Sequence, residues 1–166
     1  MSVCKWITLS FFGILLSLPL SAAALQKAET FPELTGETLT GAEFDLASLK
    51  GEPILLKVGT SWCGTCREQT KSISKLSDFM TENGIRYVDV FVQESQATVE
   101  KYFKKNNYQL PEIVLLDRGA IAKKLNIYLI PRIILIDKNF KVYRDGDTIS
   151  EKSLKKELQQ MLAAEQ

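Results

Sequence analysis

Histidine is absent from this sequence of 166 residues, and cysteine occurs only three times, at Cys4, Cys63 and Cys66. A structural zinc site needs four ligands, usually Cys or His, and a Cys4 iron–sulfur cluster needs four cysteines. Covalent haem attachment needs a histidine directly after the second cysteine of a pair, where this chain has Arg67. The sequence therefore predicts no metal centre and no haem within one chain.

An excess of one charge sign is also missing, because 21 basic residues face 20 acidic ones. A nearly neutral chain has no strong field to attract nucleic acid or an acidic partner. The length and a hydrophobic content of 45% suit one domain with a single core.

The N-terminus has the layout of a secretory signal peptide. One charge, Lys5, precedes a short apolar run, and small residues follow at 21–24. We predict a signal peptide over residues 1–24, cleaved to leave a domain over 25–166 in the periplasm or outside the cell. The alternative is an uncleaved membrane anchor, but a spanning helix needs about 20 apolar residues, and Pro19 favours cleavage.

The rest of the chain alternates between strand and helix patterns, which is typical of an α/β domain with a mixed sheet. A β-hairpin is predicted within residues 31–51. The other predicted strands cover residues 53–58, 85–92, 111–116, 130–137 and 140–144, and the predicted helices cover 63–83, 95–105, 118–125 and 150–160.

The two cysteines that outlast the signal peptide, Cys63 and Cys66, lie between a predicted strand and a predicted helix. A disulfide across so short a loop constrains the unfolded chain little, so a purely structural bridge is the weaker interpretation. At the first turn of a helix, free N–H groups and the helix dipole favour a Cys63 thiolate. Cys66, one turn later, is placed to resolve a mixed disulfide, so the pair predicts redox chemistry.

Trp62-Cys63-Gly64-Thr65-Cys66 after a strand, Ile130-Pro131 before the strand at 133–137, and an insertion over 92–111 resemble the thioredoxin superfamily. Within it, the chain is similar to secreted thiol-disulfide oxidoreductases of the TlpA/ResA type. The resemblance covers residues 31–163. It implies a three-layer fold with a central mixed sheet, an N-terminal hairpin and a TlpA/ResA-type insertion, and a redox-active disulfide in place of any cofactor.

The resemblance also assigns roles around the cysteines. It implies a cis Pro131 facing the pair, with the Ile130 backbone free to bind an extended substrate, and Trp62 as a partner contact. Glu94 is expected near the thiols, where a carboxylate raises their pKa and can shuttle a proton. The alternative for Glu94 is a solvated acid that helps to cap the helix beginning at Ser95.

Several residues depart from the family pattern. Thr65 and Thr70 stand where prolines are common, and the Gly64-Thr65 dipeptide influences the redox potential. Gly59 replaces a large aromatic residue, and we expect it to leave room for substrate beside the site.

Lys57 stands where thioredoxins carry a buried acid, and Asp89 falls about where they carry the lysine that faces it. A lone buried ammonium would cost several kcal/mol, so we expect a reversed ion pair between them beneath Cys66. This pair either tunes the thiols or only holds the structure.

These features predict an enzyme that exchanges disulfides with exported proteins, more as a reductant than as an oxidant. By resemblance its substrates include apocytochrome c, its electron donor is a membrane thiol-disulfide transporter, and it works as a monomer. One alternative is a thiol peroxidase, because Thr60 and Cys63 have the Thr-x-x-Cys spacing of peroxiredoxins, although Leu56 stands where that family has proline. The other is an adaptor that keeps its disulfide closed.

Overall fold

The computed structural model describes residues 25–108 and 111–164 and contains a seven-stranded mixed sheet in the order β2-β1-β5-β4-β3-β6-β7. β3 runs parallel to β4 and β4 to β5, whereas β6, β7 and the hairpin strands add antiparallel pairs. The strands are β1 (Thr35–Thr38), β2 (Glu43–Asp45), β3 (Ile54–Gly59), β4 (Arg86–Val92), β5 (Ile113–Asp117), β6 (Arg132–Ile136) and β7 (Val142–Gly146).

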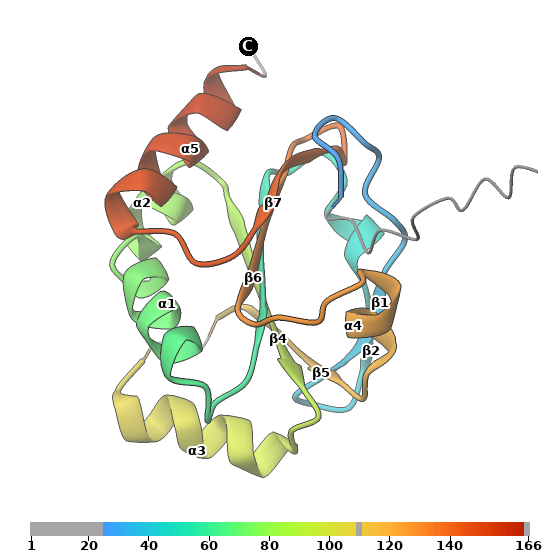
Figure 1. Cartoon of the computed structure of the whole chain (residues 1–166), viewed down its shortest axis with the longest axis vertical. Coiled ribbons are helices and arrows are strands. Elements are labelled where there is room, and N and C mark those ends of the chain that lie inside the picture. Colours follow the sequence, from blue (N-terminus) through green and yellow to red (C-terminus); the bar gives the residue numbers. More distant parts are fainter. Residues whose placement is uncertain (1–24, 109–110, 165–166) are drawn as a thin grey trace, which may run out of the picture.

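Helices cover both faces of the sheet, so the predicted three-layer thioredoxin-like arrangement is confirmed (Figure 1). α1, α2 and α5 lie on one side of the sheet and α4 lies on the other, whereas the N-terminal hairpin, β1 and β2, extends the sheet at one edge. The helices are α1 (Gly64–Ser74), α2 (Ser77–Glu82), α3 (Gln96–Asn106), α4 (Ala120–Lys124) and α5 (Glu151–Ala163), with a 3₁₀ turn, η1 (Leu46–Leu49).

The central strand β3 is buried along its whole length, as its apolar run predicts. Leu56 and Val58 belong to the core on the side of α4, whereas Leu55 belongs to the core beneath α1 and α5. Because side chains alternate along a strand, Lys57 shares the face of Leu55, toward α1. The only charge on β3 is thus carried into the packed interior.

The single helix predicted over residues 63–83 is wrong, because it is divided into α1 and α2. The Ser74 hydroxyl donates to the carbonyl of Lys71, and the Leu76 N–H donates to Ile73 at the tighter spacing of a 3₁₀ turn. Leu76 and Met80 remain buried on either side of the break. The apolar spacing therefore continues across it and does not reveal it.

The insertion contributes α3, whose N-cap is Ser95, as predicted: its Oγ accepts a hydrogen bond from the N–H of Thr98. α3 packs Val99, Tyr102 and Phe103 around Phe91 of β4.

The predicted signal peptide over residues 1–24 lies outside the described residues. Among the helices that are described, none has the length and apolar character needed to cross a membrane.

Candidate active site

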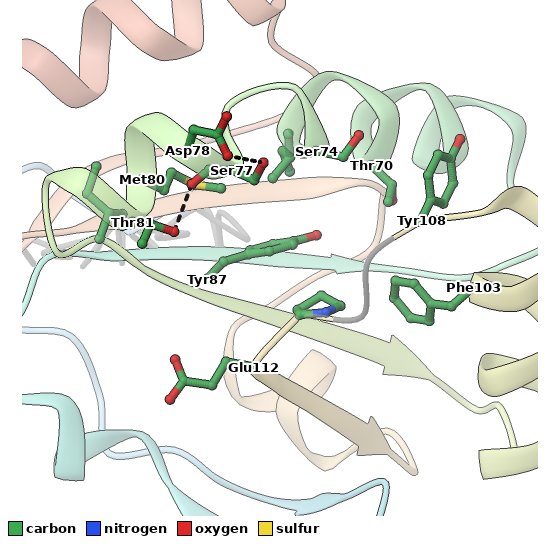
Figure 2. A pocket seen from close by; sticks show the side chains of 13 residues that line it. Thr70, Ser74, Ser77, Asp78, Met80, Thr81, Tyr87, Phe103, Tyr108 and Glu112 are labelled. Atoms are coloured by element: carbon green, nitrogen blue, oxygen red, sulfur yellow. Dashed lines mark hydrogen bonds between the residues drawn. The ribbon is translucent and has the colours of Figure 1, made fainter.

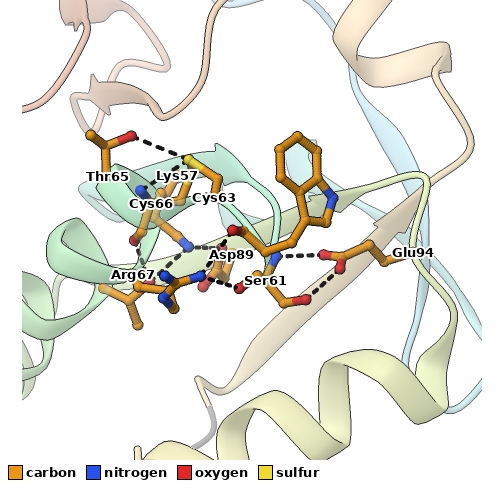
Figure 3. The surroundings of a disulfide bond; sticks show 10 residues. Lys57, Ser61, Cys63, Thr65, Cys66, Arg67, Asp89 and Glu94 are labelled. Atoms are coloured by element: carbon orange, nitrogen blue, oxygen red, sulfur yellow. Dashed lines mark hydrogen bonds and ion pairs between the residues drawn. A yellow bond between two sulfur atoms is a disulfide. The ribbon is translucent and has the colours of Figure 1, made fainter.

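Cys63 and Cys66 form a disulfide at the N-terminus of α1 (Figure 3). The two cysteines differ strongly in their exposure to solvent. Cys63 is the N-cap residue and is partly exposed, whereas Cys66 is completely buried. The N–H of Cys66 donates to Cys63 Sγ over 3.2 Å, and Thr65 Oγ1 lies 3.2 Å from the same sulfur. In the dithiol these groups favour a Cys63 thiolate, so Cys63 is the sulfur that a partner can reach and Cys66 the sulfur behind it.

The loop before β6 lies beside the cysteine loop. The Ile130-Pro131 peptide bond is cis, as the resemblance implies. Because Val58 pairs with Arg132 in the antiparallel register of β3 and β6, Pro131 lies next to Gly59 at the start of the cysteine loop. Pro131 is buried and Ile130 is partly exposed, so the backbone before the proline borders the site.

Three large apolar residues are exposed in the described part of the chain: Trp62 (71%), Tyr128 (77%) and Leu129 (81%). Trp62 directly precedes Cys63, and the other two lead into the cis proline. The sequence indicated Trp62 as a partner contact, but Tyr128 and Leu129 were missed as members of this exposed apolar surface. Two large apolar residues directly before Ile130-Pro131 could have indicated them. Together they give the two loops that flank the disulfide an apolar surface.

Glu94 holds the cysteine loop. It follows β4, and its carboxylate accepts hydrogen bonds from the N–H of Ser61, over 2.7 Å, and from the Ser61 hydroxyl. Arg67 of α1 binds the same loop by donating to the carbonyl of Trp62 over 2.9 Å. Within the described residues, no hydrogen bond joins Glu94 to either sulfur. The hydrogen bonds of Glu94 in the described part of the chain thus come from Ser61, a contact that the sequence did not reveal.

Lys57 and Asp89 form an ion pair with 2.9 Å between Nζ and Oδ1, and their side chains are 1% and 0% exposed. They lie directly opposite each other in the parallel register of β3 and β4. Lys57 Nζ also donates to Thr70 Oγ1 over 2.9 Å, and the Tyr87 hydroxyl donates to Asp89 Oδ2 over 2.9 Å. The pair expected from the sequence is present, within a network that includes two residues the sequence analysis did not assign to it.

Burial raises the pKa of Asp89 above its ordinary value, and the Lys57 ammonium and the Tyr87 hydroxyl offset this only in part. Burial likewise raises the pKa of Tyr87 well above 10, helped by the charge of Asp89.

The expectation that Gly59 leaves room for substrate is wrong. A Cβ at this position would lie 3.1 Å from Cys66 Sγ and 3.3 Å from Cys66 Cβ. Cys66 already fills the space, because the first turn of α1 packs directly on β3. Glycine is needed at this point for the buried cysteine to approach the strand.

The chain matches the Redoxin family over residues 26–161, which contain the whole site. Sporulation thiol-disulfide oxidoreductase A of Bacillus subtilis is 26% identical over 125 residues, covering 73% of this chain and 74% of that protein. Thiol:disulfide interchange protein DsbE of Haemophilus influenzae is 30% identical over 107 residues, covering 62% of this chain and 55% of that protein. Soluble secreted antigen MPT53 of Mycobacterium tuberculosis is 27% identical over 95 residues, covering 57% of this chain and 53% of that protein.

Solved structures agree on the fold. A thioredoxin-family thiol:disulfide interchange protein from Chlorobium tepidum has a TM-score of 0.68 at 23% identity, over 84% of this chain and 99% of that one. A thiol:disulfide interchange protein from Bacteroides sp. has a TM-score of 0.72 at 20% identity, over 84% of this chain and 91% of that one. With the disulfide at the helix N-terminus and the cis proline beside it, these matches give one conclusion: the chain belongs to the Redoxin family and is a thiol-disulfide oxidoreductase of the TlpA, ResA and DsbE type.

Proposed function

We propose that this oxidoreductase works outside the cytoplasm and reduces disulfides in exported proteins, with Cys63 as the nucleophile and Cys66 as the resolving thiol. The observation that carries the proposal is the unequal exposure of the pair: Cys63 is partly exposed at the end of a helix, and Cys66 is 0% exposed behind it. Only Cys63 is placed to meet a disulfide in another protein.

The reaction has two displacements. The Cys63 thiolate attacks one sulfur of the substrate disulfide, and the other substrate sulfur leaves as a thiolate and takes up a proton. The Cys66 thiolate then attacks Cys63 Sγ, the Cys63–Cys66 disulfide forms, and the second substrate sulfur leaves. Two electrons pass to the substrate, and a membrane thiol-disulfide transporter restores the dithiol.

The surface beside the disulfide suits a polypeptide substrate. The Ile130 backbone before the cis proline offers hydrogen bonds to an extended chain, and Trp62, Tyr128 and Leu129 offer apolar contacts. An unfolded exported protein presents both features. An apocytochrome c, with two cysteines close together in a chain that has not yet folded, is the substrate class we propose.

The alternatives gain no support from the geometry. In a peroxidase of the peroxiredoxin type we expect the Thr60 hydroxyl to contact the reactive cysteine. Thr60 is instead buried, and its Oγ1 forms no hydrogen bond within the described residues. An adaptor with a permanently closed disulfide has no need for the partial exposure of Cys63.

A trapping experiment tests the proposal. The reduced Cys66→Ser variant should accumulate a mixed disulfide through Cys63 with an oxidised peptide that carries the two cysteines of an apocytochrome, seen by intact mass. The Cys63→Ser variant is the matched control and should form none. Equal trapping by the two variants, or none by either, would contradict the assignment. Trapping only of unrelated disulfide proteins would contradict the substrate class.

A further inference from the structure

The first described residues of the chain lie along the outer edge of the sheet, beside β7. The Ala28 N–H donates to the carbonyl of Val142 over 2.7 Å, and the Val142 N–H donates to the carbonyl of Glu29 over 2.8 Å. A bridge between Thr30 and Lys141 continues this antiparallel pairing. The segment that follows the predicted signal peptide is therefore tied to the domain by its backbone.

Leu25 begins this segment, and its backbone nitrogen meets a buried carboxylate. The N–H of Leu25 donates to Asp145 Oδ2 of β7 over 2.7 Å. The Asp145 side chain is only 1% exposed, and the Leu25 side chain packs against the core on the side of α4. Both the backbone and the side chain of Leu25 are thus held in place.

Asp145 also binds Arg132, the residue that follows the cis proline. Its two oxygens accept hydrogen bonds from Arg132 Nε and, over 2.9 Å, from Arg132 Nη2. The charged groups around this pair comprise four acids (Glu29, Asp145, Asp147 and Glu157) and three bases (Lys27, Arg132 and Arg144), beside the phenol of Tyr143. One negative charge is unmatched in this group, so an added ammonium would balance it.

The surface beside Leu25 has room for a charged terminus. Leu25 and Asp145 border a groove of about 420 Å³, whose lining is completed by Lys27, Tyr143, Arg144, Glu157 and Gln160. An ammonium has three N–H donors, whereas an amide has one. With one donor on Asp145, the groove leaves the other two open to water or to the Glu157 carboxylate.

Another hollow with acidic residues offers an amine a weaker site. A cavity of about 290 Å³ between α1, α2 and the end of α3 has Asp78 and Glu112 in its lining (Figure 2). Both residues are exposed, and Glu112 is already paired with Arg86. Exposed carboxylates hold a cation weakly, because water and salt screen the charge. The buried carboxylate beside Leu25 is the better acceptor.

We propose that Asp145 is the binding site for the α-ammonium that cleavage before Leu25 creates. The small residues 21–24 precede Leu25, which is the layout of a signal-peptidase site. In the cleavage, water adds to the carbonyl of Ala24, and the bond to the Leu25 nitrogen breaks. Ala24 leaves as a carboxylate, and the nitrogen takes up protons to become an ammonium, already 2.7 Å from Asp145 Oδ2.

This ion pair exists only in the processed chain, so the inference rests on the extracytoplasmic location proposed above but not on the redox reaction. Before cleavage the Leu25 nitrogen is a neutral amide. Afterwards it carries a charge beside Asp145, which raises the pKa of the amine. The stability that this raised pKa contributes is present below about pH 8 and is lost as pH rises through the raised value. The mature domain therefore becomes more stable once its leader is removed.

Export of the full chain in a bacterial host, followed by amine labelling, tests the proposal. The intact mass of the purified protein identifies its first residue, which should be Leu25. Cyanate reacts only with a neutral amine, and peptide masses report how fast it modifies the Leu25 nitrogen. At pH 7 the folded protein should react about tenfold more slowly than the same protein in guanidinium chloride, since one pKa unit is tenfold in neutral amine. By about pH 10, where the amine is neutral in both states, the two rates should converge.

Two variants show which carboxylate is responsible. Asp145→Asn should restore fast labelling at pH 7. Asp147→Asn is the matched control, because Asp147 also acts on Arg132 but, within the described residues, accepts no hydrogen bond from Leu25. If Asp145→Asn does not fold, the comparison of folded with unfolded wild type still decides.

Three outcomes would overturn the proposal: an exported chain that begins at another residue, equal labelling of folded and unfolded wild type at pH 7, or slow labelling that persists at pH 10. The last would show shielding of the amine without an ion pair. A chain retained in the cytoplasm would instead contradict the proposed location, on which the inference rests. Failure to trap a substrate through Cys63 would contradict the proposed redox function and leave these labelling results unchanged.

Discussion

Breaking the buried ion pair from one side should strongly destabilise the oxidised protein. In Lys57→Met, Asp89 keeps its place at 0% exposure but loses the ammonium 2.9 Å away. Removal of one partner of a buried pair costs about 3–5 kcal/mol, because the other charge is left uncompensated. The cost should be larger at pH 8 than at pH 5, because a lone buried carboxyl can escape it by taking up a proton.

Urea unfolding of the oxidised protein measures this effect. With a denaturant dependence of about 2 kcal/mol per molar urea, the expected loss lowers the midpoint by about 1.5–2.5 M. Lys57→Met/Asp89→Val should recover most of the loss, since an apolar pair of similar volume is often neutral or stabilising.

The exposed pair Lys75–Glu151, with side chains 58% and 42% exposed, provides the control. Lys75→Met should change the free energy of unfolding by less than about 1 kcal/mol. If Lys57→Met also stays within about 1 kcal/mol of wild type at pH 8, the pair is not the uncompensated ionic contact described above, and the reasoning fails.

Three other perturbations follow from the same contacts. The pKa of Asp89 is raised in the folded protein. At a pH between the ordinary and the raised pKa, the folded protein therefore keeps a proton on this carboxyl that the unfolded chain has lost. Stability should fall as pH rises through that window, and Asp89→Asn should remove this slope in urea titrations. Gly59→Ala should lose about 1–3 kcal/mol in the same assay, because the new Cβ would lie 3.1 Å from Cys66 Sγ. Glu94→Gln and Ser61→Ala should change the rate of attack by Cys63 alike, since each removes part of one contact; different pH profiles would contradict a role for Glu94 through Ser61.

The elements that the sequence predicted correctly are those with a local signal. The buried strand β3, the start of the helix after Cys63 and the proline turn before β6 are each indicated by a few neighbouring residues. The pairing of Lys57 with Asp89 was also predicted, because thioredoxins carry an acid and a lysine at about these two places and a buried charge requires an opposite charge within reach.

The parts that the sequence did not reveal depend on how closely separate elements approach each other. Gly59 was expected to leave space, yet the first turn of α1 lies so close to β3 that Cys66 occupies it. The hydrogen bonds of Thr70 to Lys57 and of Tyr87 to Asp89 depend on how α1 and β4 pack in three dimensions, which the sequence does not give. The hydrogen bonds from Ser61 to Glu94 likewise depend on the position of the loop between β3 and α1, which the sequence does not give.

The reduction potential of the Cys63–Cys66 pair tests the central claim, that this dithiol donates electrons to exported proteins, most directly. It can be measured by equilibrating the protein with glutathione or dithiothreitol buffers and counting free thiols by mass after alkylation. The account predicts a value below about −180 mV, the potential of protein disulfide isomerase, so that the dithiol reduces its substrates. A value well above that, near the roughly −120 mV of the oxidant DsbA, would contradict it.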